Sequence, residues 1–108
     1  MIREITARQL AMRLENGESF YLLDVRQPVE HAVAALPDST LIPLGQLAAR
    51  ADEVRPPEGV PIVVYCHHGV RSQHGAAALL RLGHREVYSL AGGIDAWSLE
   101  VDPTVPRY

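Results

Sequence analysis

Cysteine is nearly absent from this sequence, which has one cysteine, Cys66, among its 108 residues. A single cysteine excludes a disulfide within the chain, and such chains are typical of reducing compartments. A hydrophobic core must therefore hold the fold together. Hydrophobic residues make up 47% of the sequence, enough for one core in a domain of this size. We therefore predict a single domain over residues 1–108.

Three other features are missing. The ten basic residues form no stripe and the net charge is -3, so nothing indicates binding to nucleic acid. No apolar run is long enough to span a membrane, and the first residues lack the apolar stretch of a signal peptide. We expect a cytoplasmic protein that binds neither membrane nor nucleic acid.

Apolar runs bounded by turn residues predict strands that alternate with helices. Strands are predicted over residues 2–5, 20–24, 41–42, 60–65 and 86–90. Helices are predicted over residues 7–15, 44–51, 73–82 and 95–98, with a short helical or irregular stretch after Pro28 and an extended tail over residues 102–108. This alternation predicts an α/β fold with a parallel sheet, whose sites lie beyond the carboxyl ends of the strands.

The segment around Cys66 carries the chemistry. The apolar run 62–65 predicts a buried strand, and Ser72 is predicted to be the N-cap of the next helix, so Cys66 lies between the two elements. A tight loop there turns backbone N–H groups inward and stabilises an anion such as a thiolate. Gly69 suits a position of positive φ. Arg71 offers a planar fork of donors, either to an oxyanion or as a structural brace for the loop, and both roles stay open. These residues indicate a cysteine nucleophile in an anion-binding loop.

This loop resembles the active loop of rhodanese-type sulfurtransferases. Its residues are Cys66, His67, His68, Gly69, Val70, Arg71 and Ser72. The segments Asp24-Val25-Arg26 and Gly92-Gly93-Ile94-Asp95-Ala96-Trp97 resemble two further motifs of the family, so the likeness covers nearly the whole chain. It implies a rhodanese-like three-layer sandwich of about five mainly parallel strands with helices on both faces. It also implies that Cys66 is catalytic and that the other loop residues bind the anion or the persulfide.

One segment departs from the family pattern. Many members carry Gly-His-x-Pro-Gly-Ala before their third strand, whereas residues 34–39 read Ala-Ala-Leu-Pro-Asp-Ser. The family's conformation of this turn, and any role of the loop in contacting a partner, are therefore not carried over to this chain. Near the site, we interpret Asp24, Arg26 and Glu30 as a supporting set of ion pairs or hydrogen bonds.

The histidines and aromatic residues are interpreted more simply. His67 and His68 are adjacent and are expected to point in different directions, and no second Cys or His stands at zinc-like spacing, so we expect no metal. We expect them to line the pocket, and whether either assists catalysis stays open. His31 is expected at the surface or the rim, and Trp97 in the core.

Three functions are compared. The first is a thiosulfate sulfurtransferase that uses a Cys66 persulfide and needs no cofactor, with a small anionic donor and a thiol, cyanide or protein acceptor. The second is a persulfide relay or regulatory module with little activity on free thiosulfate. The third, more remote, is a cysteine phosphatase, disfavoured because those enzymes place one residue more between cysteine and arginine than the four found here. Donor, acceptor and pathway stay open, and a monomer or weak dimer is expected.

Overall fold

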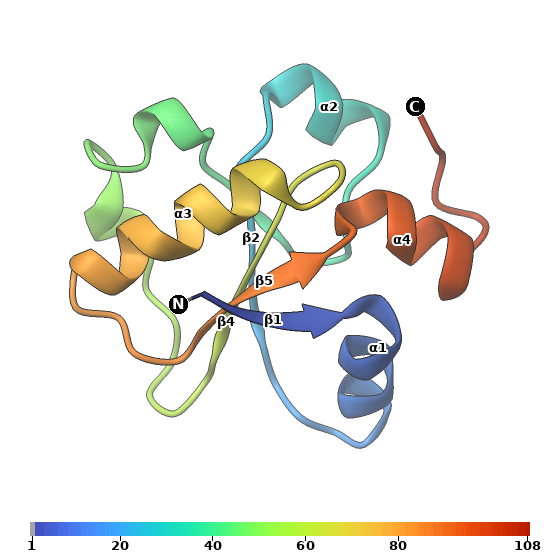
Figure 1. Cartoon of the computed structure of the whole chain (residues 1–108), viewed down its shortest axis with the longest axis horizontal. Helices are drawn as coiled ribbons and strands as arrows, with labels where there is room; N and C mark the ends of the chain where they lie inside the picture. Colours follow the sequence, from blue (N-terminus) through green and yellow to red (C-terminus); the bar gives the residue numbers. More distant parts are fainter. Residues whose placement is uncertain (1) are drawn as a thin grey trace.

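The computed structural model describes residues 2–108, and its centre is one sheet of five strands in the order β1-β5-β4-β2-β3 (Figure 1). The strands are β1 (Arg3–Thr6), β2 (Tyr21–Asp24), β3 (Thr40–Leu41), β4 (Ile62–Tyr65) and β5 (Val87–Ala91). All four strand pairings are parallel. The predicted α/β fold with a mainly parallel sheet is confirmed.

Strand β4 occupies the middle of the sheet, and all four of its residues are buried. Its side chains alternate between two hydrophobic clusters, as the period of a strand requires. Val63 and Tyr65 belong to one cluster, and Ile62, Val64 and Cys66 belong to the other. The side chain of Cys66 therefore points to a defined face of the sheet.

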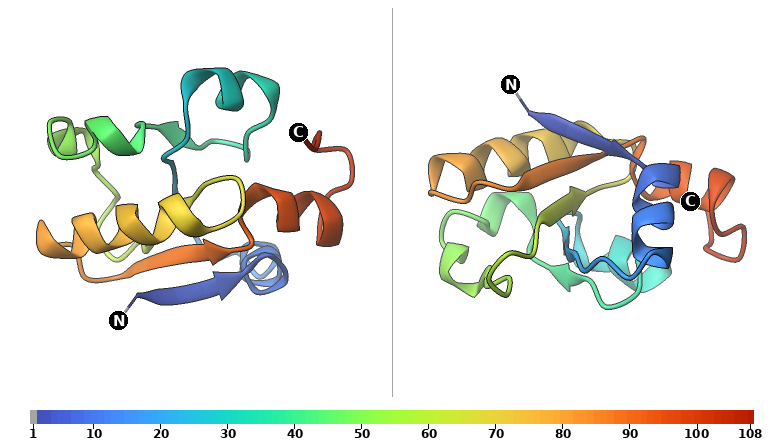
Figure 2. Two further views of the ribbon diagram at one scale, coloured as in Figure 1. Left: turned by 45° about the horizontal axis from the view of Figure 1, so that its top comes forward. Right: turned by 90° about the horizontal axis from the view of Figure 1, so that it is seen from below.

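Helices cover both faces. They are α1 (Ala7–Glu15), α2 (Pro28–Val33), α3 (Val70–Arg81) and α4 (Gly93–Glu100), with two short 3-10 turns, η1 (Leu44–Gln46) and η2 (Ala51–Glu53). Helices α1 and α4 supply the first cluster, and α3 supplies the second together with the segment around η1 and η2. In the right view of Figure 2, α1 and α4 lie side by side and away from α3. This is the three-layer arrangement expected from the sequence.

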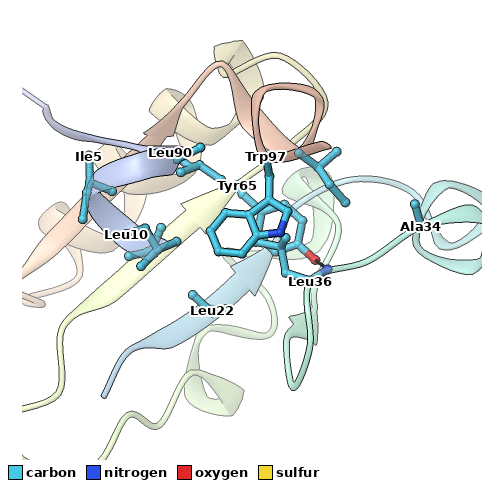
Figure 3. Close-up of a cluster of buried hydrophobic side chains, with 11 residues drawn as sticks. Ile5, Leu10, Leu22, Ala34, Leu36, Tyr65, Leu90 and Trp97 are labelled. Atoms are coloured by element: carbon cyan, nitrogen blue, oxygen red, sulfur yellow. Dashed lines mark hydrogen bonds between the residues drawn. The ribbon is translucent and has the colours of Figure 1, made fainter. Parts of the chain in front are cut away.

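The cluster beneath α4 contains Trp97, which is buried as predicted (Figure 3). Beside it, the hydroxyl of Tyr65 accepts a hydrogen bond from the backbone N–H of Leu36 at 3.1 Å and lies 2.8 Å from the hydroxyl of Ser39. Both partners belong to the segment that departs from the family pattern. The segment is therefore anchored to the central strand from inside the core.

One of the predicted helices is absent. Residues 44–51 form no α-helix: η1 covers Leu44–Gln46 and η2 begins only at Ala51, because Pro43 lacks a side-chain cap and Gly45 weakens any helix here. Over residues 2–108, we find no helix with the length and apolar character needed to cross a membrane.

Candidate active site

The loop after β4 is shorter than predicted. Gly69 adopts a φ of +107° and serves as the N-cap of α3, which begins at Val70. Ser72 is therefore not the N-cap, and that prediction is wrong. Because a glycine in the left-handed conformation starts the helix earlier, Ser72 lies in the first turn, buried, with its hydroxyl 2.7 Å from that of Ser89.

Three polar groups surround the sulfur of Cys66. The backbone N–H of Gly69 donates to Sγ at 3.1 Å, and that of Ser72 donates at 3.4 Å. The thiol in turn donates to the hydroxyl of Ser72 at 3.6 Å. Cys66 is 1% exposed, so these donors act on a sulfur shielded from water. A negative charge on the sulfur is stabilised by such donors at a helix N-terminus.

The carbonyls of the loop are held from behind by α4. The backbone N–H of Ile94 donates to the carbonyl of Cys66 at 2.9 Å, and that of Asp95 donates to the carbonyl of His67 at 3.1 Å. Gly93, with a φ of +61°, allows this approach, because a Cβ there would lie 2.5 Å from the carbonyl oxygen of Cys66. This role was not predicted from the sequence. The sequence feature that could have indicated it is the adjacent pair Gly92-Gly93 at the end of a strand.

Arg71 is held by Glu30 from helix α2. Its two terminal guanidinium nitrogens donate to the two carboxylate oxygens of Glu30, at 2.7 and 3.0 Å. The Arg71 side chain is 36% exposed, so the pair lies at the protein surface. The hydrogen bonds from Arg71 hold the pKa of Glu30 at about 2, below its ordinary 4.5. Glu30 therefore stays ionised and keeps Arg71 in position at neutral pH.

The pair predicts a specific loss of stability in acid. Since ionised Glu30 is favoured in the folded state, its contribution is complete above pH 4.5 and is lost as the pH falls toward 2. In this window the free energy of unfolding should fall by about 1–2 kcal/mol more in the wild type than in Glu30→Gln, after allowance for solvent screening. Urea unfolding of both proteins across the window measures the difference. Parallel pH profiles would contradict the assigned role of Glu30.

The neighbouring pair of Asp24 and Arg26 is fully buried. Nε of Arg26 donates to one carboxylate oxygen of Asp24 at 2.8 Å, and a terminal nitrogen donates to the other at 2.7 Å. The predicted ion pair is present, but Glu30 directs its carboxylate to Arg71 instead. His31 lies at the rim as expected, with its side chain 30% exposed, and its Nδ1 lies 2.8 Å from Asp24. Arg26 also donates to the carbonyl of Ala34 at 2.6 Å, which ties the end of β2 to the segment after α2.

His67 and His68 were expected to point in different directions, and this prediction is wrong. Their rings stack, with centroids 3.9 Å apart and planes 26° from parallel. Tyr108 stacks on His67 as well, at 3.9 Å and 9°. Burial and the nearby ring of His68 lower the pKa of His67, so it is neutral near pH 7. The loop is thus covered by an aromatic stack that local sequence did not reveal.

His67 and His68 form, with Asp95, a group whose potential ligand atoms lie within 4.8 Å of one another. Their geometry does not suit a metal. A metal binds in the plane of an imidazole ring, and nearly parallel stacked rings have no shared in-plane point at bonding distance. Asp95 is also bound by Arg107, whose Nε lies 2.8 Å from its carboxylate. We therefore assign no metal to these residues.

A parallel sheet with a cysteine after its central strand, and backbone N–H groups directed at the sulfur, defines a class of α/β domain built around a cysteine loop. The chain belongs to the rhodanese-like domain family, whose profile matches residues 6–100. The family resemblance drawn from the sequence is therefore confirmed.

Relatives and solved structures agree with this assignment. The chain is 35% identical to a sulfurtransferase of Allochromatium vinosum over 97% of this chain and 96% of that protein. It is 32% identical to the putative sulfur carrier protein YrkF of Bacillus subtilis, over 90% of this chain but 51% of that longer protein. Among solved structures, a rhodanese-related protein from Thermoplasma volcanium matches with a TM-score of 0.82 and 28% identity, over 98% of this chain and 99% of that one.

Proposed function

We propose that this protein is a thiosulfate-type sulfurtransferase that works in a reducing, cytoplasmic setting and carries the transferred sulfur on Cys66 as a persulfide. The observation that carries the proposal is the placement of the Gly69 and Ser72 N–H groups on Sγ of Cys66. A thiolate there is a nucleophile, and the same donors stabilise a charge on the added sulfur.

The reaction has two steps. In the first, the thiolate of Cys66 attacks the outer sulfur of thiosulfate, a new S–S bond forms, and the S–S bond of the donor breaks. Sulfite leaves with the bonding electron pair, and Cys66 carries a persulfide anion. In the second, a nucleophile such as cyanide or a thiolate attacks the outer sulfur, and the electron pair returns to Cys66 as thiolate. No oxidant, reductant or cofactor enters this sequence.

Arg71 is assigned the binding of the anionic donor. It stands two residues past Gly69, and its side chain is 36% exposed although two of its guanidinium nitrogens are bound by Glu30. Arg71→Ala should lower kcat/KM for thiosulfate by about tenfold to a hundredfold, the loss expected for one hydrogen bond to a charged group. Steady-state kinetics with Arg71→Lys, which keeps the charge but loses the fork, provides the matched control. An unchanged kcat/KM in a folded Arg71→Ala protein would remove Arg71 from donor binding.

A persulfide relay is the second candidate. Two observations favour it: Cys66 is 1% exposed, and a related protein bears the name of a putative sulfur carrier. In a relay, a partner protein would load and unload Cys66 and free thiosulfate would be a poor donor. Segment 34–39, which departs from the family pattern, is the proposed contact surface for such a partner.

Intact mass spectrometry after incubation with thiosulfate alone tests the proposal, together with the rate of thiocyanate formation once cyanide is added. A mass gain of one sulfur atom with steady turnover supports the enzyme, and the same gain without turnover supports the relay. If folded protein shows neither, the thiosulfate sulfurtransferase proposal fails. Hydrolysis of p-nitrophenyl phosphate is then measured to test the phosphatase.

A further inference from the structure

Residues 102–108, which we call the strap, leave the end of α4 and turn back toward α2 (Figures 1 and 2). The carboxylate of Asp102 accepts hydrogen bonds from the N–H and the hydroxyl of Thr104, at 3.1 and 2.5 Å. The carbonyl of Asp102 accepts another from the N–H of Val105 at 3.1 Å. Val105 then packs against the cluster that contains Trp97. The path of the strap is thus set by its own turn and by the core.

The last two side chains tie the strap to the site. The hydroxyl of Tyr108 accepts a hydrogen bond from Arg26 at 2.7 Å and donates one to Glu30 at 2.9 Å. Its ring lies flat on the ring of His67. Arg107 adds the ion pair with α4 described above. Tyr108 therefore joins the end of β2, helix α2 and the active loop through one side chain.

These contacts place Tyr108 against the loop that carries the reactive sulfur. His67 directly follows Cys66, and its Nε2 is buried without a hydrogen-bond partner among the described residues. Glu30, which accepts from Tyr108, also holds Arg71. Tyr108 is itself 42% exposed, so no close-packed core locks it in place. A side chain tied by two hydrogen bonds and one stacked ring can leave without unfolding the domain.

We infer that Tyr108 is a specificity-determining residue that controls which sulfur donors and acceptors reach Cys66. This inference rests on the proposed sulfur transfer and adds how access to Cys66 would be regulated. While Tyr108 lies on His67, small reagents such as thiosulfate reach the sulfur by a minor opening of the loop. A bulky persulfide or a protein thiol reaches it only when the strap is displaced.

Alkylation of Cys66 tests the inference without any sulfur transfer, and the label goes to one place because the chain has a single cysteine. Rates are measured with iodoacetamide and with a maleimide that carries a bulky polymer. If the open state is a minor one, Tyr108→Ala should raise the rate with the bulky maleimide by about tenfold or more, with a much smaller change for iodoacetamide. Tyr108→Phe keeps the stacked ring and loses both hydrogen bonds, so its rate with the bulky maleimide should lie between those of the wild type and Tyr108→Ala.

Tyr88→Phe is the control, because it removes a tyrosine hydroxyl on β5 that makes no hydrogen bond to the strap or the cysteine loop among the described residues, and its ring lies under Arg3 instead. Equal acceleration of both reagents by Tyr108→Ala would mean general loosening and would overturn the inference, as would unchanged rates. Kinetics add a second readout: KM for glutathione persulfide should fall relative to KM for thiosulfate in Tyr108→Ala. If wild-type protein transfers no sulfur but the selectivity between reagents holds, the proposed function fails and the control of access stands.

Discussion

Cys66→Ser is expected to abolish sulfur transfer while the domain stays folded. A serine hydroxyl is not ionised at neutral pH, so the nucleophile is lost, and an oxygen cannot form the persulfide. The exchange is nearly isosteric in a pocket that already contains the hydroxyls of Ser72 and Ser89. The free energy of unfolding should therefore change by no more than about 1–2 kcal/mol. Activity should fall to the rate of the uncatalysed reaction.

The measurement compares thiocyanate formation and intact mass for wild type, Cys66→Ser and Cys66→Ala. Neither variant should gain a sulfur atom from thiosulfate, and both should unfold cooperatively in urea. The alanine variant separates the loss of the nucleophile from an effect of the new hydroxyl on the loop hydrogen bonds. Residual turnover above the blank in either folded variant would refute the role assigned to Cys66.

The parts of the site that the sequence predicted are those that local chemistry determines. A continuous apolar run predicts strand β4. The position of Cys66 just after this strand is predicted because the run ends there. Gly69 was expected at a position of positive φ, and the structure confirms it. Each of these inferences needed only a few neighbouring residues. A pattern within one turn or one strand contains enough information to make them.

The missed parts are long-range pairs. Glu30 and Arg71 are 41 positions apart, and Arg26 and Tyr108 are 82 positions apart. No local propensity links such residues, because the pair exists only after the sheet has brought β2 and β4 together and α4 has turned the chain back. The N-cap of α3 was wrongly assigned to Ser72 for a related reason. Serine is a favoured N-cap residue, but the tight loop needs a left-handed residue at the helix start, and Gly69 provides it.

Taken together, these contacts make the loop a structure held from three sides. The Gly69 and Ser72 N–H groups fix the sulfur from within the loop, and α4 binds the outward carbonyls of Cys66 and His67. Arg71 is bound separately, to α2 through Glu30. Because the N–H groups turn inward and the carbonyls turn outward, the loop presents positive potential to the sulfur. The approach of α4 is therefore as important to the site as the loop itself.

Gly93→Ala should disrupt this approach and is expected to be the most destabilising single substitution in the loop region. An alanine there adopts the left-handed conformation at a φ of +61°, and its Cβ would lie 2.5 Å from the carbonyl oxygen of Cys66. The backbone strain is about 1–2 kcal/mol, and the clash with fixed backbone raises the total to about 3 kcal/mol or more. The carbonyls of the loop would also lose their N–H partners on α4. Sulfur transfer should fall even in the protein that remains folded.

Gly59 provides the matched control, because it has a φ of +78° and open space around its Cβ position. Gly59→Ala should lower the free energy of unfolding by about 1–2 kcal/mol, which measures the strain alone. Gly93→Asn serves as a second variant, since asparagine tolerates the left-handed conformation while its Cβ keeps the clash. Urea unfolding of the three variants separates the two effects. If Gly93→Ala and Gly59→Ala lost equal stability, the close packing of α4 on the cysteine loop would not be what fixes the site.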